Sequence, residues 1–151
     1  MTAMPGARAG AKRAMQPVIR IEKPWGWELL WARTERYVGK ILHINSGAAL
    51  SYQFHRKKDE TIYLLRGTLD LEFAPAGGRK RRRRIQAGEG LRIRPGDRHR
   101  MTAVSACDVL EASTPELDDV VRLEDRYGRE DAAKGGRSGS NAHSRSRKVL
   151  S

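Results

Sequence analysis

Short runs in which hydrophobic and polar residues alternate recur along the chain from Val18 onward. In the clearest run, residues 68–73, three hydrophobic side chains share one face and three polar side chains share the other, as in a half-buried strand. Trp27, Leu29 and Trp31 likewise share one face. Further strands are expected at 18–21, 37–45, 50–55, 61–65, 91–94, 99–104 and 107–112. Glycine-containing turns separate the runs, and helical periodicity is confined to a short turn around 115–120, so we predict an all-β sandwich or barrel.

The predicted strands define one domain. A chain of 151 residues has the length of a single domain, and its hydrophobic content of 38% places part of that length outside the core. The flanks are rich in Gly, Ala and Ser and lack the hydrophobic residues needed to fold. We therefore expect a domain at 18–130 between disordered basic tails at 1–17 and 131–151.

The net charge of +12 is unevenly distributed. The two flanks and the run Arg79–Arg84 account for the excess, and the remaining body, 18–78 and 85–129, balances at 16 bases against 16 acids. Because the predicted domain carries no basic face interleaved with aromatics, we expect no specific nucleic-acid binding, only weak polyanion binding by the tails. The arginine run is interpreted as a solvated hairpin edge that discourages pairing between sheets, with an anionic partner as the alternative.

Cys107 is the only cysteine, so no disulfide within the chain is possible and a reducing compartment is expected. The N-terminal residues have no hydrophobic core of the kind found in signal peptides, and no stretch approaches the length that spans a membrane. These features predict a cytoplasmic protein without membrane contact.

Candidate chemistry is concentrated in four residues. Gln53 and His55 are two apart on one predicted strand and point to the same face, Glu60 follows across a charged turn, and His99 lies on another strand after Pro95-Gly96. A barrel can gather these side chains in one mouth. Two imidazoles, a carboxylate and an amide oxygen suit a divalent transition metal. The alternatives are ordinary strand histidines, a solvated turn glutamate, and an amide that holds water.

This pattern resembles the motifs of the cupin superfamily. The first motif is matched by Gly47, five residues, Gln53, one residue, His55, four residues, Glu60, six residues and Gly67. The second motif is matched by the pair Gly96 and His99. The resemblance implies a double-stranded β-helix, the jelly-roll barrel of cupins, with Gln53, His55, Glu60 and His99 as ligands of one divalent metal ion. Gln53 departs from the motif, since most cupins have histidine there.

The glutamine is typical of one subfamily, the cupin domain of type II phosphomannose isomerases, which is often fused behind a mannose-1-phosphate guanylyltransferase. Lys23-Pro24-Trp25-Gly26 resembles the start of that domain, and 119–129 resembles its closing signature. The resemblance covers roughly residues 22–130. Two features depart from it: Thr61 follows Glu60 where the family commonly has histidine, and the arginine run is not a family feature.

The resemblance implies isomerisation of mannose 6-phosphate and fructose 6-phosphate, in nucleotide-sugar or polysaccharide precursor metabolism. Lys58 is then a candidate proton shuttle, on condition that burial lowers its pKa. Arg100 follows the second-motif histidine, as arginine does in the subfamily, and is a candidate for stabilising the enediolate or binding the sugar. Arg122 and Arg129 are candidate phosphate contacts, because guanidinium groups match phosphate geometry. Lys58 as a solvated turn residue is the competing interpretation.

Other functions remain open at this level. A non-catalytic metal- or sugar-binding cupin, or another metal-dependent cupin enzyme such as a lyase or a dioxygenase, would use the same ligands. Zinc is the first expectation for the metal, with iron, manganese, cobalt and nickel as alternatives. The expected partners are a small sugar phosphate and a second copy of the chain in a homodimer.

Overall fold

A computed structural model describes residues 13–131, which form eleven strands and no helix. The strands are β1 (Ile19–Lys23), β2 (Gly26–Arg33), β3 (Val38–Ile44), β4 (Tyr52–Phe54), β5 (Glu60–Arg66), β6 (Thr68–Ala74), β7 (Arg81–Gln86), β8 (Gly90–Ile93), β9 (Arg98–Ala103), β10 (Cys107–Ser113) and β11 (Val121–Glu124). The described residues therefore contain no helix that could cross a membrane. Most of the two expected tails, 1–17 and 131–151, lies outside the described residues.

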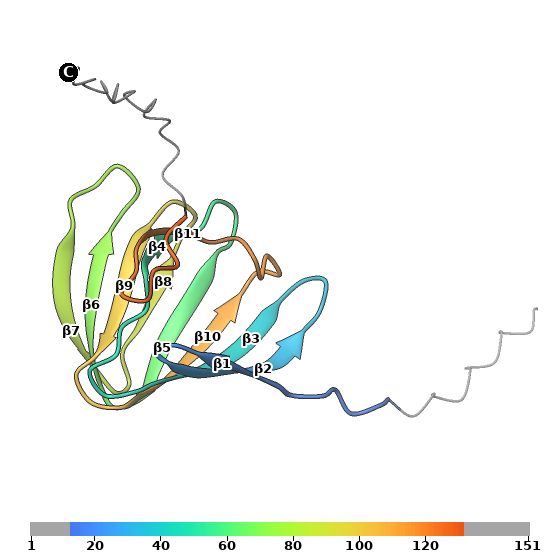
Figure 1. Cartoon of the computed structure of the whole chain (residues 1–151). Helices are drawn as coiled ribbons and strands as arrows, with labels where there is room; N and C mark the ends of the chain where they lie inside the picture. Colours follow the sequence, from blue (N-terminus) through green and yellow to red (C-terminus); the bar gives the residue numbers. More distant parts are fainter. Residues whose placement is uncertain (1–12, 132–151) are drawn as a thin grey trace, which may run out of the picture.

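The strands form two antiparallel sheets that face each other (Figure 1). One sheet has the order β1-β2-β3-β10-β5-β8, and the other has the order β11-β4-β9-β6-β7. Hydrophobic side chains from both sheets fill the space between them, among them Leu42, Ile44, Leu64, Leu69, Ile93, Met101 and Val109. The predicted all-β class is confirmed, and burying both inner faces explains the period of two in the sequence.

Two strands were not expected. The arginine run, expected at a hairpin edge, enters strand β7 at Arg81, and β7 is the outermost strand of the five-stranded sheet. It pairs with β6 so that Arg84 faces Asp70 and Arg82 faces Glu72. Strand β11 pairs with β4, the strand that carries Gln53, and so forms the other edge of the five-stranded sheet. Cross-strand charge pairs stabilise β7 where hydrophobic alternation is absent.

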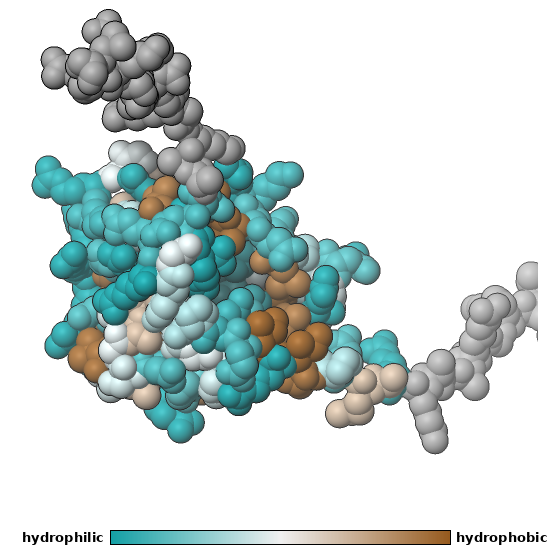
Figure 2. Space-filling view, viewed as in Figure 1, coloured by the Kyte–Doolittle hydropathy of each residue, from teal (hydrophilic) through white to brown (hydrophobic). Residues whose placement is uncertain are grey.

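The predicted face formed by Trp27, Leu29 and Trp31 lies on the outside of the six-stranded sheet, since the alternate residues of β2 are the buried ones. Trp31 is half exposed. Most of the molecular surface seen in Figure 2 is hydrophilic, but hydrophobic residues gather beside the point where the N-terminal segment leaves the barrel. Exposed Val18 and Ile19 belong to this part of the chain.

The glycines that bound the first motif have different structural roles. Gly67 lies between β5 and β6 with φ of 92°, and a Cβ there would lie 2.3 Å from the carbonyl oxygen of Ala106. Gly47 has φ of 78°, yet a Cβ there would meet no atom within 4 Å. Both positions favour glycine by backbone conformation, but only Gly67 also requires it for space.

Candidate metal centre and its cavity

Three of the four predicted ligands lie together inside the barrel. His55 follows β4 and His99 lies on β9, both in the five-stranded sheet, whereas Glu60 opens β5 in the opposite sheet. Glu60 Oε1 lies 3.2 Å from His55 Nε2 and 3.3 Å from His99 Nε2. All three side chains are buried, and one ligand atom from each lies within 4.8 Å of the others. The two sheets thus bring together three residues that lie up to 44 positions apart in the sequence.

Each imidazole ring is oriented by a contact between its Nδ1 atom and a backbone carbonyl. His55 Nδ1 lies 2.5 Å from the backbone carbonyl of Asp119, and His99 Nδ1 lies 3.2 Å from that of Asp97. A ring that donates from Nδ1 to a carbonyl keeps its Nε2 lone pair free, and both Nε2 atoms face Glu60. This is the arrangement that a metal-binding histidine requires. Asp119 belongs to the segment before β11, so this segment supports the site directly.

Gln53 stands at the edge of the cluster. It pairs with His99 in the register of β4 and β9, and its Nε2 lies 3.5 Å from His99 Nε2. Its Oε1 accepts a hydrogen bond of 2.7 Å from the Ser51 hydroxyl. Because a hydroxyl both donates and accepts, Ser51 supports either orientation of the amide, including one that turns the oxygen toward the cluster.

Lys58 is buried beside the cluster. Its ammonium lies 2.7 Å from Glu60 Oε2 and 2.6 Å from Glu111 Oε1. Burial alone would lower the pKa of Lys58, but the charges and hydrogen bonds of Glu111 and Glu60 outweigh it and hold the pKa above its ordinary value. The condition set for Lys58 as a proton shuttle, a lowered pKa, is therefore not met, and at neutral pH Lys58 is a charged hydrogen-bond donor.

The carboxyls on either side of Lys58 have opposite pKa shifts. Burial alone would raise the pKa of Glu60, but its close contacts with His55 and His99 and the charge of Lys58 place that pKa well below its ordinary value. Burial, followed by the negative charge of Glu60, raises the pKa of Glu111. A carboxyl with a raised pKa inside a cavity is a feature of acid–base sites.

Sequence reasoning missed Glu111 and the second buried pair, Lys40 and Glu28, whose Nζ and Oε1 atoms are 3.2 Å apart. The alternation of inward and outward residues along the predicted strand could have identified Glu111. Glu111 follows Cys107 and Val109 on the buried face of β10, and a charged residue at an inward position of a barrel strand marks a polar interior.

A cavity of about 100 Å³ adjoins the cluster. Five cationic and two acidic side chains line it together with Gln53 and His55: Lys23, Lys40, Lys58, Arg122, Arg129, Glu28 and Glu111. Arg122 Nε is buried without a hydrogen-bond partner among the described residues. Arg129 is oriented by Asp125, to which its Nε and Nη2 atoms donate at 2.8 and 3.0 Å. The structure thus places both predicted phosphate contacts at this cavity.

Arg100 is not brought to this site. It neighbours His99 on β9, so the two side chains point to opposite faces, and Arg100 lies on the outside of the sheet. There its Nε donates to Glu72 Oε2 at 2.5 Å, and its Nη1 lies 3.3 Å from Glu124. An outward side chain held by two carboxylates cannot stabilise an enediolate inside the barrel.

The cluster fits a divalent metal ion. Two imidazoles oriented through Nδ1 and one ionised carboxylate form a borderline-hard donor set, with the amide of Gln53 next to it. Lys58 pairs with Glu60 Oε2, whereas Glu60 Oε1 faces the Nε2 atoms of both histidines. A cation between Oε1 and the two Nε2 atoms would coordinate all three and remove the crowding of three acceptors.

No protein-family model and no curated protein matches this chain. Solved structures do match its fold. Oxalate decarboxylase from Bacillus subtilis at pH 4.6 superposes with a TM-score of 0.65 at 15% identity, over 78% of this chain and 33% of that chain. CapF from Staphylococcus aureus, a capsular polysaccharide assembling protein, gives 0.60 at 16% identity, over 72% and 33%. KdgF from Halomonas sp. gives 0.57 at 18% identity, over 68% and 89%.

These neighbours are cupin-fold proteins, so the double-stranded β-helix predicted from the motifs is confirmed. The aligned part spans about a third of the length of CapF and of the oxalate decarboxylase. Similarity at this level of identity establishes the fold and leaves the activity to be argued from the site.

Proposed function

We propose that this protein is a metal-dependent sugar-phosphate isomerase of the mannose 6-phosphate/fructose 6-phosphate type. The observation that carries the proposal is that the cavity beside the ligand cluster, which His55 also lines, is lined by more cationic than acidic side chains. One of these cations is Arg122, whose buried Nε has no hydrogen-bond partner among the described residues. A metal-binding cupin without an anionic substrate would have no need for that excess.

Phosphate recognition is assigned to Arg122 and Arg129. Arg129 is preorganised by Asp125 and remains a quarter exposed, so it faces the entrance. The cavity has about the volume of three water molecules, which admits the carbonyl end of an open-chain sugar and not a whole hexose phosphate. The phosphate would therefore lie at the rim, where guanidinium groups bind it through paired hydrogen bonds.

Proton transfer is assigned to Glu111 with the help of Lys58. Isomerisation removes a proton beside a carbonyl and returns it to the neighbouring carbon. A divalent ion held by His55, Glu60 and His99 would supply Lewis-acid stabilisation of the oxyanion. Glu111 lines the cavity as a carboxylate that burial makes more basic. The ammonium of Lys58, 2.6 Å from it, holds Glu111 in place and can donate a hydrogen bond to a sugar oxygen.

The neighbours add general support. CapF is named as a capsular polysaccharide assembling protein, so one fold neighbour is linked to carbohydrate by its name. The terminal signature 119–129, on which the resemblance to phosphomannose isomerases depends, forms β11 and the segment that carries Arg122 and Arg129. Three residues of this stretch, Val120, Arg122 and Arg129, line the cavity, which supports the proposal.

The test is a coupled assay of fructose 6-phosphate formation from mannose 6-phosphate after reconstitution with zinc, manganese, cobalt, nickel or iron. We expect turnover with at least one metal, loss of turnover in Glu111→Gln, and an increase of about tenfold or more in KM in Arg122→Ala with its metal content unchanged. Arg66→Ala, an exposed arginine on the opposite sheet, is the matched control. Absence of turnover with every metal would favour a non-catalytic binding cupin.

A further inference from the structure

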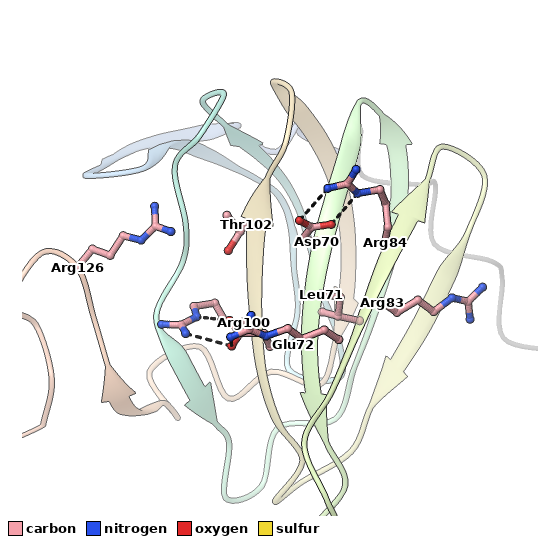
Figure 3. A pocket seen from close by; sticks show the side chains of 9 residues that line it. Asp70, Leu71, Glu72, Arg83, Arg84, Arg100, Thr102 and Arg126 are labelled. Atoms are coloured by element: carbon pink, nitrogen blue, oxygen red, sulfur yellow. Dashed lines mark hydrogen bonds and ion pairs between the residues drawn. The ribbon is translucent and has the colours of Figure 1, made fainter.

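The outer face of the five-stranded sheet carries a second cavity, of about 420 Å³, which the proposed isomerase function does not use. Figure 3 shows its side chains on β6, β7 and β9 and on the segment that follows β11. The register aligns two rows across the sheet. One row is Arg84, Asp70 and Thr102, and the other is Arg82, Glu72 and Arg100. Arg126 comes from outside the sheet and completes the lining.

The carboxylates neutralise only part of this charge. Asp70 accepts both Nε and Nη2 of Arg84, at 2.9 and 3.1 Å, and Glu72 accepts the same pair of atoms from Arg100. Hydrogen bonds from these arginines lower the pKa of both acids, so both stay ionised at neutral pH. Glu124, 3.3 Å from Arg100, and Lys80, 3.7 Å from Glu72, add one charge of each sign. The four guanidinium groups and Lys80 therefore face three carboxylates, a local excess of two positive charges.

Two of the arginines have most of their donors free. A guanidinium carries five N–H donors. Within residues 13–131, Arg82 makes one hydrogen bond, from Nη2 to Glu72 at 3.3 Å, and Arg126 makes one, from Nη1 to the backbone carbonyl of Gly47 at 3.0 Å. Figure 3 shows Arg83 extending to the other side of β7. There Arg83 donates to Glu89. A run that served only to protect the edge of β7 would not require arginines from β9 and from the segment after β11 to converge on it.

The spacing selects for an elongated ligand. The carbonyl of Gly47, to which Arg126 donates, belongs to a residue whose N–H bonds to Ala103 at the end of β9. β9 is two strands from β7, about 10 Å at about 4.8 Å per strand, so Arg82 on β7 and Arg126 line the shared cavity from two sides. A chain of phosphates matches this span better than a single phosphate group does. We propose that this outer cavity binds a small polyphosphate anion, either free or as the phosphate chain of a nucleotide, held between Arg82 and Arg126 over the floor formed by Arg84 and Arg100.

The test is isothermal titration calorimetry of the full chain with inorganic tripolyphosphate, at an ionic strength of about 0.15 M so that weak surface binding is screened. Arg82→Ala/Arg126→Ala should weaken binding by about tenfold or more. The matched control, Arg79→Ala/Arg81→Ala, also removes two positive charges, both from the arginine run and neither from the lining, and should change binding less than twofold. Circular dichroism checks the fold of both variants.

Further titrations identify the source of the phosphate chain. Orthophosphate should bind at least about tenfold more weakly than tripolyphosphate, because it matches the span between the two arginines less well. ATP that binds as tripolyphosphate does would show that the phosphate chain alone is recognised, whereas tighter ATP binding would assign the cavity to a nucleotide. Equal weakening in both double variants, or no binding of tripolyphosphate to the wild type, would overturn the proposal.

Discussion

The ammonium of Lys58 lies 2.6 Å from Glu111 Oε1 in the interior of the barrel, where both side chains are buried. The same ammonium lies 2.7 Å from Glu60 Oε2, so a single cation balances two carboxylates that face it from neighbouring strands. Burial of this triad costs desolvation energy that only complete pairing offsets. Lys58 therefore links the candidate metal centre to the candidate base.

Removing the cation should destabilise the protein strongly. Lys58→Met leaves two buried carboxylates without their counter-charge, and we expect the free energy of unfolding to fall by about 3–5 kcal/mol at neutral pH, as measured by urea denaturation. Lys58→Met/Glu111→Leu, which removes both partners, should recover part of the loss. A decrease below about 1 kcal/mol in the single variant would mean that solvent reaches the pair and screens it.

The pairing of Asp125 with Arg129 predicts that the free energy of unfolding decreases as the pH becomes acidic. Hydrogen bonds from Arg129 hold the pKa of Asp125 below its ordinary 3.8. A lowered pKa contributes stability that is present above the ordinary pKa and is lost as the pH falls through the folded-state pKa. Asp125→Asn should lower the free energy of unfolding by about 1–3 kcal/mol at neutral pH, measured by urea denaturation.

The same comparison repeated in acid gives the control. The difference between wild type and Asp125→Asn should shrink as the pH falls below 3.8, because the wild-type carboxyl then becomes protonated as well. A difference that stays constant through this range would assign the loss to packing and not to charge.

The motif glycines give a test of the fold. Gly67→Ala should cost about 3 kcal/mol, because a positive φ and a contact with the carbonyl of Ala106 both oppose a side chain. Gly47→Ala should cost only about 1 kcal/mol, since its surroundings are open. Thermal unfolding of the two variants compares them, and equal losses would contradict the difference in space described here.

Much of this site could be predicted because its signals are local. His55 and Glu60 are separated by one charged turn, and the glycine spacing fixes the strands on either side, so motif and geometry agree. The outward position of Arg100 could also have been predicted from the sequence, since neighbours on a strand such as His99 and Arg100 point to opposite faces. The prediction followed the family resemblance instead of that rule.

What the sequence could not reveal depends on register. The pairing of Lys58 with Glu111, and of Lys40 with Glu28, joins residues from different strands, and which residues face each other is decided by sheet pairing and not by local pattern. Strand β7 was hidden for a related reason: its arginines are stabilised by acids on β6, a partnership invisible within the run itself. The homodimer and the cytoplasmic location remain predictions.

The proposed function requires a cation held by His55, Glu60 and His99. The direct measurement is the metal content of purified protein after incubation with Zn²⁺, Mn²⁺, Co²⁺, Ni²⁺ or Fe²⁺ and dialysis. We expect one bound ion per chain with at least one of these metals and none in His55→Ala/His99→Ala. In contrast, His43→Ala, which removes a histidine paired with Asp108 on the outer face, should retain the ion. Circular dichroism confirms that each variant is folded. Wild-type protein that retains no ion, or a double variant that retains as much as wild type, would contradict the account.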